Sequence, residues 1–156
     1  MADVVEGAKA PDFELAGAGG PMRLADFAGK ALVVYFYPKD DTSGCTREAQ
    51  DFSELAPDFA RAGVAVVGVS KDSLASHAKF TTKYNLDVPL GSDPDGAVVA
   101  AFGAWVEKSM YGRKYMGIER STFLIDADGV VRRIWRKVRV PGHAIEVLKA
   151  AQALNS

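Results

Sequence analysis

The run of apolar and aromatic residues at positions 31–37 constrains the fold of this chain more than any other feature. It has the length of one strand, and it is rich in the β-branched and aromatic side chains of a strand buried on both faces. Pro38 ends the run, and from Cys45 onward apolar residues recur every three or four positions, as on one face of a helix. The sequence therefore predicts a buried strand, a turn over 42–44, and a helix with Cys45 in its first turn.

The rest of the chain continues this alternation of strands and helices. Residues 64–70 form a second apolar run, and strand, helix and strand in this order predict a right-handed unit with parallel strands. Pro57 is unfavourable inside a helix, so we expect a kink or a new start near Ala56. The other predicted strands lie at 12–15, 22–24, 88–90, 121–126 and 130–137, the other helices at 72–84, 97–102 and 143–154, and residues 105–117 are expected to be irregular. Together these elements predict an α/β protein.

Cys45 is the only cysteine, and its predicted position favours a reactive thiolate. Unpaired N–H groups and the positive end of the helix dipole meet at a helix N-terminus and stabilise an anion there. Two observations oppose this interpretation: the negative charges of Asp40 and Asp41 lie nearby in sequence, and a lone cysteine is often an inert core residue. From position alone, both interpretations stay open.

Length and composition exclude several classes of protein. A chain of 156 residues is expected to form one domain over 1–156, and its formal net charge of −1 argues against binding to nucleic acid or a membrane surface. We therefore interpret the basic segment 132–139 as a solvated strand face. The apolar runs are too short to span a bilayer, and no signal peptide is visible. One cysteine cannot form an internal disulfide, which fits a reducing, cytoplasmic location.

No metal or cofactor is expected either. The two histidines, His77 and His143, are too few for a convincing metal cluster, and no phosphate-binding glycine loop or dinucleotide fingerprint is present. Any redox chemistry would therefore be carried by the sulfur of Cys45.

Two separated motifs resemble those of a known family. The spacing of Pro38, Thr42 and Cys45 is similar to the peroxidatic loop of peroxiredoxins, and the block 110–126 resembles the segment that carries their active-site arginine, here Arg120. With Trp105, the chain most resembles the bacterioferritin comigratory protein, or Q-type, branch, in order from about residue 5 to 154. The resemblance implies a thioredoxin-like fold, with a central mixed sheet flanked by helices and an N-terminal β-hairpin extension.

The resemblance also implies a function and the residues that perform it. Cys45 would attack hydrogen peroxide or an organic hydroperoxide and become a sulfenic acid, in antioxidant defence. Thr42, Arg120 and the backbone N–H groups of Gly44 and Cys45 would bind the peroxide, and Pro38 would shield the pocket from water.

Alternatives accompany some of these assignments. Arg120 has the alternative of a surface arginine bonded to Glu119 or to another carboxylate. Trp105, Tyr111 and Met110 are candidates for the pocket wall, with plain core packing as the alternative. Arg47 is expected to pair with Asp51 at helical spacing, whether or not it also helps the thiolate.

The chain departs from many Q-type relatives in its thiol content. Gln50 stands where they carry a resolving cysteine, and the alternative position, in the helix over 73–84, also lacks one. A sulfenic acid on Cys45 would need an external thiol, such as thioredoxin, glutaredoxin or a small thiol, and the helix would not have to unwind to join two sulfurs. We expect a monomer or weak homodimer.

Three other functions are alternatives to a peroxidase. A dithiol–disulfide oxidoreductase is disfavoured because the chain has no Cys-x-x-Cys pair. A redox-controlled binding or chaperone module, and a purely structural domain, remain as non-enzymatic alternatives.

Overall fold

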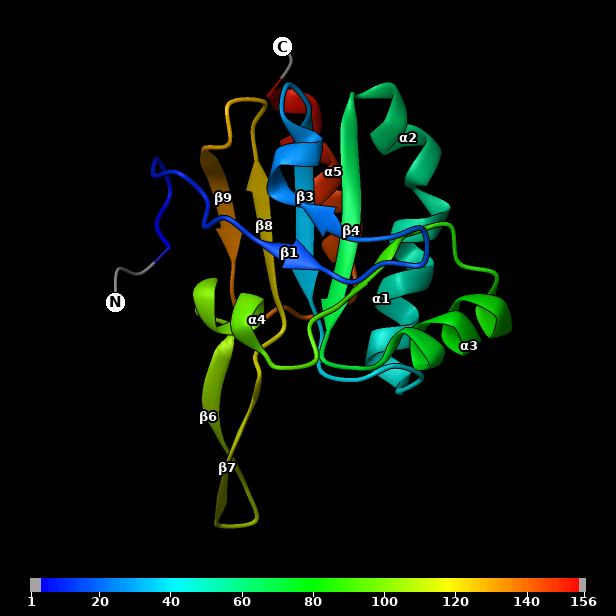
Figure 1. The fold of residues 1–156 in the computed structure, drawn as a ribbon, viewed down its shortest axis with the longest axis vertical. Coiled ribbons are helices and arrows are strands. Elements are labelled where there is room, and N and C mark those ends of the chain that lie inside the picture. Colours follow the sequence, from blue (N-terminus) through cyan, green and yellow to red (C-terminus); the bar gives the residue numbers. More distant parts are fainter. Residues whose placement is uncertain (1–3, 155–156) are drawn as a thin grey trace.

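A five-stranded mixed sheet forms the centre of the computed structural model, which describes residues 4–154 (Figure 1). The strand order is β5-β4-β3-β8-β9. Strand β3 (Ala31–Phe36) is central, parallel to β4 and antiparallel to β8. The other bounds are β4 (Val64–Ser70), β5 (Leu90–Ser92), β8 (Ser121–Ile125) and β9 (Val131–Trp135). The predicted central mixed sheet is confirmed.

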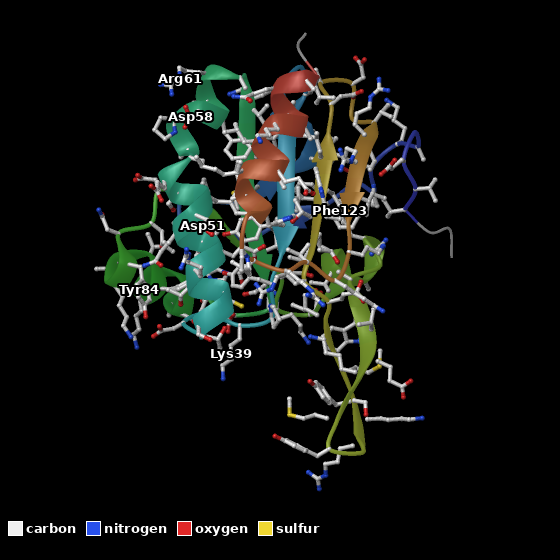
Figure 2. All side chains as sticks on the ribbon, turned by 180° about the vertical axis from the view of Figure 1, so that it is seen from behind. Lys39, Asp51, Asp58, Arg61, Tyr84 and Phe123 are labelled. Atoms are coloured by element: carbon white, nitrogen blue, oxygen red, sulfur yellow. The ribbon has the colours of Figure 1, made fainter. Side chains whose placement is uncertain are left out.

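Every residue of β3 is buried, because alternate side chains enter two separate cores. Ala31, Val33 and Tyr35 face the core beneath the main helices, which cover this side of the sheet in Figure 2. These helices are α1 (Ser43–Glu54), α2 (Ala56–Arg61), α3 (Leu74–Tyr84) and α5 (His143–Ala153). The opposite face is covered by β1 (Glu14–Leu15), β2 (Met22–Arg23), the 3₁₀ helix η1 (Leu24–Phe27) and α4 (Ala97–Ala101) (Figure 1).

Several local predictions are confirmed. Cys45 lies in the first turn of α1, and the helical segment is interrupted at Leu55, so that Pro57 falls in the first turn of α2, where its missing N–H costs nothing. Strands β1 and β2 pair as the expected N-terminal hairpin. The strand predicted at 88–90 begins later, at Leu90, because Pro89 has no N–H to donate to a sheet.

The prediction that residues 105–117 are irregular was wrong. They form most of an antiparallel hairpin, β6 (Trp105–Met110) and β7 (Arg113–Ile118), which projects beyond the lower end of the sheet in Figure 1. Tyr111 and Gly112 make its two-residue turn, and both have positive φ angles, 53° and 78°. Tyrosine is an unusual residue in such a turn, where asparagine or aspartate normally signals a hairpin.

The end of the sheet near this hairpin is also where the parallel strands finish. Strand β3 continues there into the loop over 37–42 and then α1, and β4 continues into the start of α3. Segments distant in sequence therefore meet around Cys45.

Between residues 4 and 154, no helix has the length and apolar character needed to cross a membrane.

We predict that Gly68→Ala destabilises the fold. Gly68 lies opposite Tyr35 in the β3–β4 register, and a Cβ there would come within 2.6 Å of the buried Tyr35 ring and hydroxyl. This overpacking should lower the free energy of unfolding by about 1–3 kcal/mol, measured by chemical denaturation. Gly19→Ala is the control, because a Cβ at Gly19 meets no atom within 4 Å. Equal effects of the two substitutions would contradict the packing argument.

Candidate active site

The sulfur of Cys45 is buried at the start of α1. The side chain is only 1% exposed and packs in the core beneath the main helices. The earliest N–H of α1 with a helical acceptor is that of Thr46, which donates to the Thr42 carbonyl at 2.8 Å. The preceding N–H groups, including those of Gly44 and Cys45, have no acceptor within the helix. Their partial positive charge therefore gathers around the thiol.

Arg120, between β7 and β8, joins the sulfur to a carboxylate. Its Nη2 donates to Cys45 Sγ at 3.3 Å, and its Nη1 donates to Glu48 Oε1 at 2.7 Å. Its side chain is 17% exposed, so it is not the surface arginine of the alternative, although it does pair with a carboxylate, that of Glu48 in place of Glu119. A hydrogen bond from a cation to sulfur favours the thiolate over the thiol. The predicted proximity of Arg120 and Cys45 is thus present in the structure.

Gly44 permits this close approach. A Cβ at position 44 would lie 3.2 Å from Arg120 Nη2, tighter than an ordinary contact. A side chain here would therefore press on the guanidinium that reaches the sulfur.

Glu48 is a member of this cluster that the sequence reasoning missed. Its side chain is fully buried, and its Oε2 has no hydrogen-bond partner among the described residues. Burial raises the pKa of Glu48 to about 7, against the opposing attraction of Arg120. An acidic residue one turn after Cys45, on the same face as Ala49 and Phe52, was the available signal.

Thr42 and Pro38 lie at the exposed edge of the site. The Thr42 hydroxyl donates to the Lys39 carbonyl at 2.9 Å and makes no hydrogen bond to Cys45. Both side chains are exposed, and Lys39, between them in sequence, is seen below the N-terminal end of α1 in Figure 2. The Thr42 hydroxyl is therefore occupied within its own loop and does not bond to the sulfur.

A buried cluster around Asp40 fixes the loop that precedes Cys45. Asp40 accepts hydrogen bonds from Tyr37 at 2.6 Å and Ser76 at 2.8 Å, and lies 2.7 Å from His77 Nδ1. Burial raises the pKa of Asp40, but the hydrogen bonds from His77, Tyr37 and Ser76 outweigh burial and leave it below its usual value. His77 Nε2 lies 3.1 Å from the Gly91 carbonyl, so the ring also links Asp40 to β5.

Asp41 forms a second attachment of this loop to α3. Its carboxylate accepts from Lys83 at 2.8 Å and from the Tyr84 hydroxyl at 2.5 Å, and Tyr84 is labelled in Figure 2. The hydrogen bonds from Lys83 and Tyr84 lower the pKa of Asp41. The negative charges that seemed to oppose a thiolate are therefore each compensated by other groups.

The structure does not bring the remaining candidates to the sulfur. Tyr111 is 98% exposed at the tip of the β6–β7 hairpin, so it forms no buried pocket wall. Trp105 packs against the core on the opposite face of the sheet from the main helices, which matches the core-packing alternative. Lys71 Nζ lies 4.5 Å above its ring. The expected Arg47–Asp51 pair is confirmed at 3.2 Å, on the exposed side of α1.

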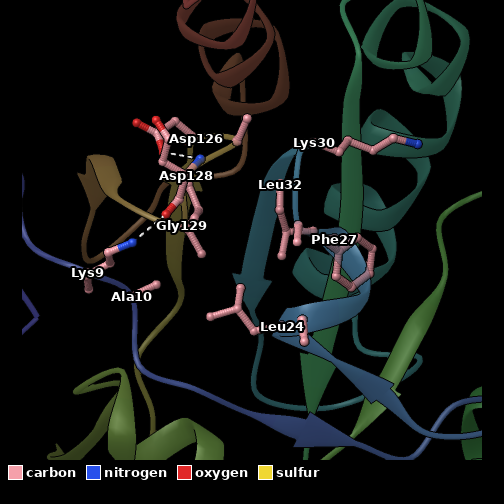
Figure 3. A pocket seen from close by; sticks show the side chains of 13 residues that line it. Lys9, Ala10, Leu24, Phe27, Lys30, Leu32, Asp126, Asp128 and Gly129 are labelled. Atoms are coloured by element: carbon pink, nitrogen blue, oxygen red, sulfur yellow. Dashed lines mark hydrogen bonds between the residues drawn. The ribbon is translucent and has the colours of Figure 1, made fainter.

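A separate cavity of about 220 Å³ lies at the opposite end of the sheet (Figure 3). It is bordered by Leu32 near the start of β3 and by Ile125 at the end of β8, together with Lys9, Leu24 and Phe27. Because the Cys45 loop follows the other end of β3, this cavity is not part of the site. Across residues 4–154, no group of three acidic, histidine or cysteine side chains is arranged to hold a metal ion.

The chain is similar in sequence to several known proteins. The sequence profile described as the AhpC/TSA family matches residues 7–134. Peroxiredoxin Bcp of Xanthomonas campestris is 50% identical over 143 residues, covering 91% of this chain and 89% of that protein. Peroxiredoxin Bcp of Bacillus subtilis is 46% identical over 150 residues, covering 96% of each.

A solved structure of a relative has the same fold as this chain. The bacterioferritin comigratory protein of Xanthomonas campestris, studied for its alkyl peroxide reduction activity, superposes with a TM-score of 0.88 at 48% identity, covering 92% of each chain. The predicted thioredoxin-like fold is confirmed by this similarity.

We predict that Glu48→Gln changes how stability depends on pH. The folded protein retains a proton at Glu48 that the unfolded chain releases near pH 4.5. The Glu48 contribution should therefore lower the free energy of unfolding as the pH rises from about 4.5 to about 7, by roughly 3 kcal/mol. Glutamine keeps an oxygen for Arg120 but does not titrate, so this fall should disappear.

Denaturation at several pH values measures the difference between the variant and the parent protein. Glu54→Gln, at an exposed position of the same helix, is the matched control and should leave the profile unchanged. A Glu48→Gln profile parallel to that of the parent would refute the raised pKa.

Proposed function

As a member of the AhpC/TSA family and a peroxiredoxin of the Bcp group, this chain is a thiol-dependent peroxidase, and we propose that Cys45 is its nucleophile. The observation that carries this proposal is the 3.3 Å hydrogen bond from Arg120 Nη2 to Cys45 Sγ at the start of α1. A thiolate, a permanently charged guanidinium and unpaired backbone N–H groups are the parts needed to attack a peroxide and stabilise the departing oxygen.

In the proposed reaction, the Cys45 thiolate attacks one peroxide oxygen. The O–O bond breaks, the sulfur gains that oxygen and becomes a sulfenic acid, and the other oxygen leaves as hydroxide or alkoxide and takes up a proton. Arg120 and the N–H groups of Gly44 and Cys45 are proposed to stabilise the charge that moves onto the leaving oxygen. Both hydrogen peroxide and organic hydroperoxides are proposed substrates, and alkyl peroxide reduction by the Xanthomonas relative supports the second class.

Other residues are proposed to position these groups. Glu48 accepts from Nη1 and thereby orients Arg120, leaving Nη2 for the sulfur. The Thr42 hydroxyl donates its proton to the Lys39 carbonyl, so the hydroxyl oxygen is free to accept a hydrogen bond from the peroxide. Pro38, at the exposed edge of the same loop, is proposed to limit access of water.

We propose that an external thiol completes the cycle, because the sequence contains no second cysteine. Its attack on the sulfenic acid forms a mixed disulfide and releases water, and a second thiol then regenerates Cys45. Thioredoxin, glutaredoxin and small thiols are the candidate reductants, in a reducing cytoplasm. One central sheet supports a single domain over 1–156, proposed to be a monomer or weak homodimer.

The nucleophile is tested by trapping its oxidised form. One equivalent of hydrogen peroxide, with a sulfenic-acid trap present, should add the mass of the trap to the reduced protein at Cys45 within seconds. Cys45→Ser should remain folded and unmodified, and should have no turnover with peroxide and thiol. Retained turnover in Cys45→Ser, or an unmodified parent protein after minutes, would overturn the assignment. Oxidation that stops after one equivalent despite added thiols would indicate a redox-controlled binding module.

The role of Arg120 is tested with a matched pair of substitutions. Arg120→Lys keeps the charge but loses the planar fork that reaches Cys45 and Glu48 together, so oxidation by peroxide should slow by about tenfold or more. Stopped-flow fluorescence of the two tryptophans measures this step, and reduction by dithiothreitol is measured separately. Arg47→Lys, on the exposed side of α1, should change oxidation less than twofold. A larger effect on reduction than on oxidation at Arg120 would contradict its proposed role.

A further inference from the structure

The β6–β7 hairpin exposes an unusual amount of apolar surface beside the site. Seven large hydrophobic side chains are exposed among the described residues, and four of them belong to this hairpin: Met110, Tyr111, Tyr115 and Met116. Their exposed fractions range from 44% to 98%. The hairpin projects from the same end of the sheet as the loop before Cys45 (Figure 1). Exposed apolar groups gathered in this way mark a contact surface.

The two faces of the hairpin differ, and the strand register assigns the side chains to them. Residues directly opposite in an antiparallel pair share a face. The pairs Lys108–Tyr115 and Met110–Arg113 therefore lie on one face, which we call the site face. The pairs Glu107–Met116 and Ser109–Lys114 lie on the other, which we call the far face.

Lys108, on the site face, lies near enough to Arg120 and Cys45 for their charges to act on it. Its stem lies across Gly117, where a Cβ would be 3.3 Å from the lysine Cδ. Burial and the positive charge of Arg120 lower the pKa of Lys108, while Cys45 and Glu119 act in the opposite direction. These interactions place the ammonium group within the electric field of the site. The base of the far face instead carries Trp105 and Ile118, which pack in the core on the opposite side of the sheet from the main helices.

The charges of the two faces also differ. The site face carries Lys108 and Arg113 and no acidic residue, whereas the far face carries Glu107 together with Lys114. Within residues 4–154, no salt bridge involves Lys108 or Arg113. The site face is therefore a basic strip with exposed Met110 and Tyr115 between its charges, leading away from Cys45.

We propose that the site face docks the protein thiol that recycles Cys45, and that this partner surrounds its thiol with an acidic and partly apolar surface. The inference rests on the proposed function, which requires an external thiol. The partner's thiolate attacks the sulfenic sulfur, an S–S bond forms as the S–O bond breaks, and water leaves after protonation. A second thiol of the partner then attacks the partner's own sulfur in this bond, releasing the Cys45 thiolate and leaving the partner oxidised.

The burial of Cys45 explains why a docking surface would matter. At 1% exposure, the sulfur is out of reach of a protein thiol until the structure opens around it. A partner already held on the site face has its thiol beside Cys45 whenever this opening occurs, so the step no longer depends on a chance encounter.

Two matched pairs of substitutions test the proposal, because the hairpin carries equivalent residues on its two faces. Arg113→Glu and Lys114→Glu make the same change of charge at adjacent positions on opposite faces. Met110→Ser and Met116→Ser remove similar side chains, 56% and 50% exposed, from the site face and the far face. The probe is reduced thioredoxin with its reductase and NADPH, and dithiothreitol is the small-thiol comparison.

For thioredoxin, kcat/KM should fall about tenfold in Arg113→Glu and several-fold in Met110→Ser, and the loss in Arg113→Glu should shrink at high salt. Lys114→Glu and Met116→Ser should remain within twofold of the parent protein. Recycling by dithiothreitol should not distinguish the members of either pair. Oxidation by peroxide is measured separately, so failure of that step in the parent protein would refute the proposed function itself.

Three outcomes would overturn the docking proposal. Equal losses on the two faces would indicate a general effect of charge or of hairpin stability. Unchanged kcat/KM in both site-face variants would show that thiol proteins approach elsewhere. A concentration-dependent dimer that dissociates in Met110→Ser but not in Met116→Ser, seen by analytical ultracentrifugation, would assign the surface to a second copy of this chain.

Discussion

The arrangement around Cys45 depends on the partly buried guanidinium of Arg120. Its two terminal nitrogens donate to the sulfur and to Glu48, so one cation contacts two groups that are both out of water. Removing a charge from water is costly unless it is paired, and here the pairing serves both partners. Gly44 leaves the space for this contact, and β8 begins immediately after Arg120 and holds its backbone beside the central strand.

The loop between β3 and α1 is fixed from the other side by α3. Asp40 is attached internally through Ser76 and His77, and Asp41 is attached at the surface through Lys83 and Tyr84. The buried contacts of Asp40 persist in salt, whereas the exposed Asp41–Lys83 pair is screened. The cysteine helix therefore starts from a position that two independent sets of contacts define, and the parallel strands bring both sets to one end of the sheet.

Sequence reasoning predicted the parts of this arrangement that are local. An apolar run, a proline and a change of period are sufficient to place Cys45 in the first turn of a helix after a buried strand. The family resemblance added Arg120, which is distant in sequence. Glu48 was missed because an acidic residue in a helix normally faces water, and its burial depends on a partner 72 residues away. The Asp40–His77 contact joins residues 37 apart and has no periodicity to reveal it. The β6–β7 hairpin was missed because its turn contains Tyr111 in place of a common turn residue.

A single, enclosed sulfur also has a consequence for how such a peroxidase would fail. Under the proposed mechanism, no thiol in the chain captures the sulfenic acid, so its lifetime depends on the supply of reductant. During that interval a second peroxide competes with the thiol, and its reaction gives a sulfinic acid that ordinary thiols do not reverse. The contacts of Asp40 and Asp41 that fix the loop would slow the reaction with a protein thiol more than the reaction with a peroxide. A small peroxide would need less opening around the enclosed sulfur than a protein thiol would. Inactivation would therefore depend on the ratio of peroxide to reductant, and tighter closure of the loop would lower the peroxide concentration at which it begins.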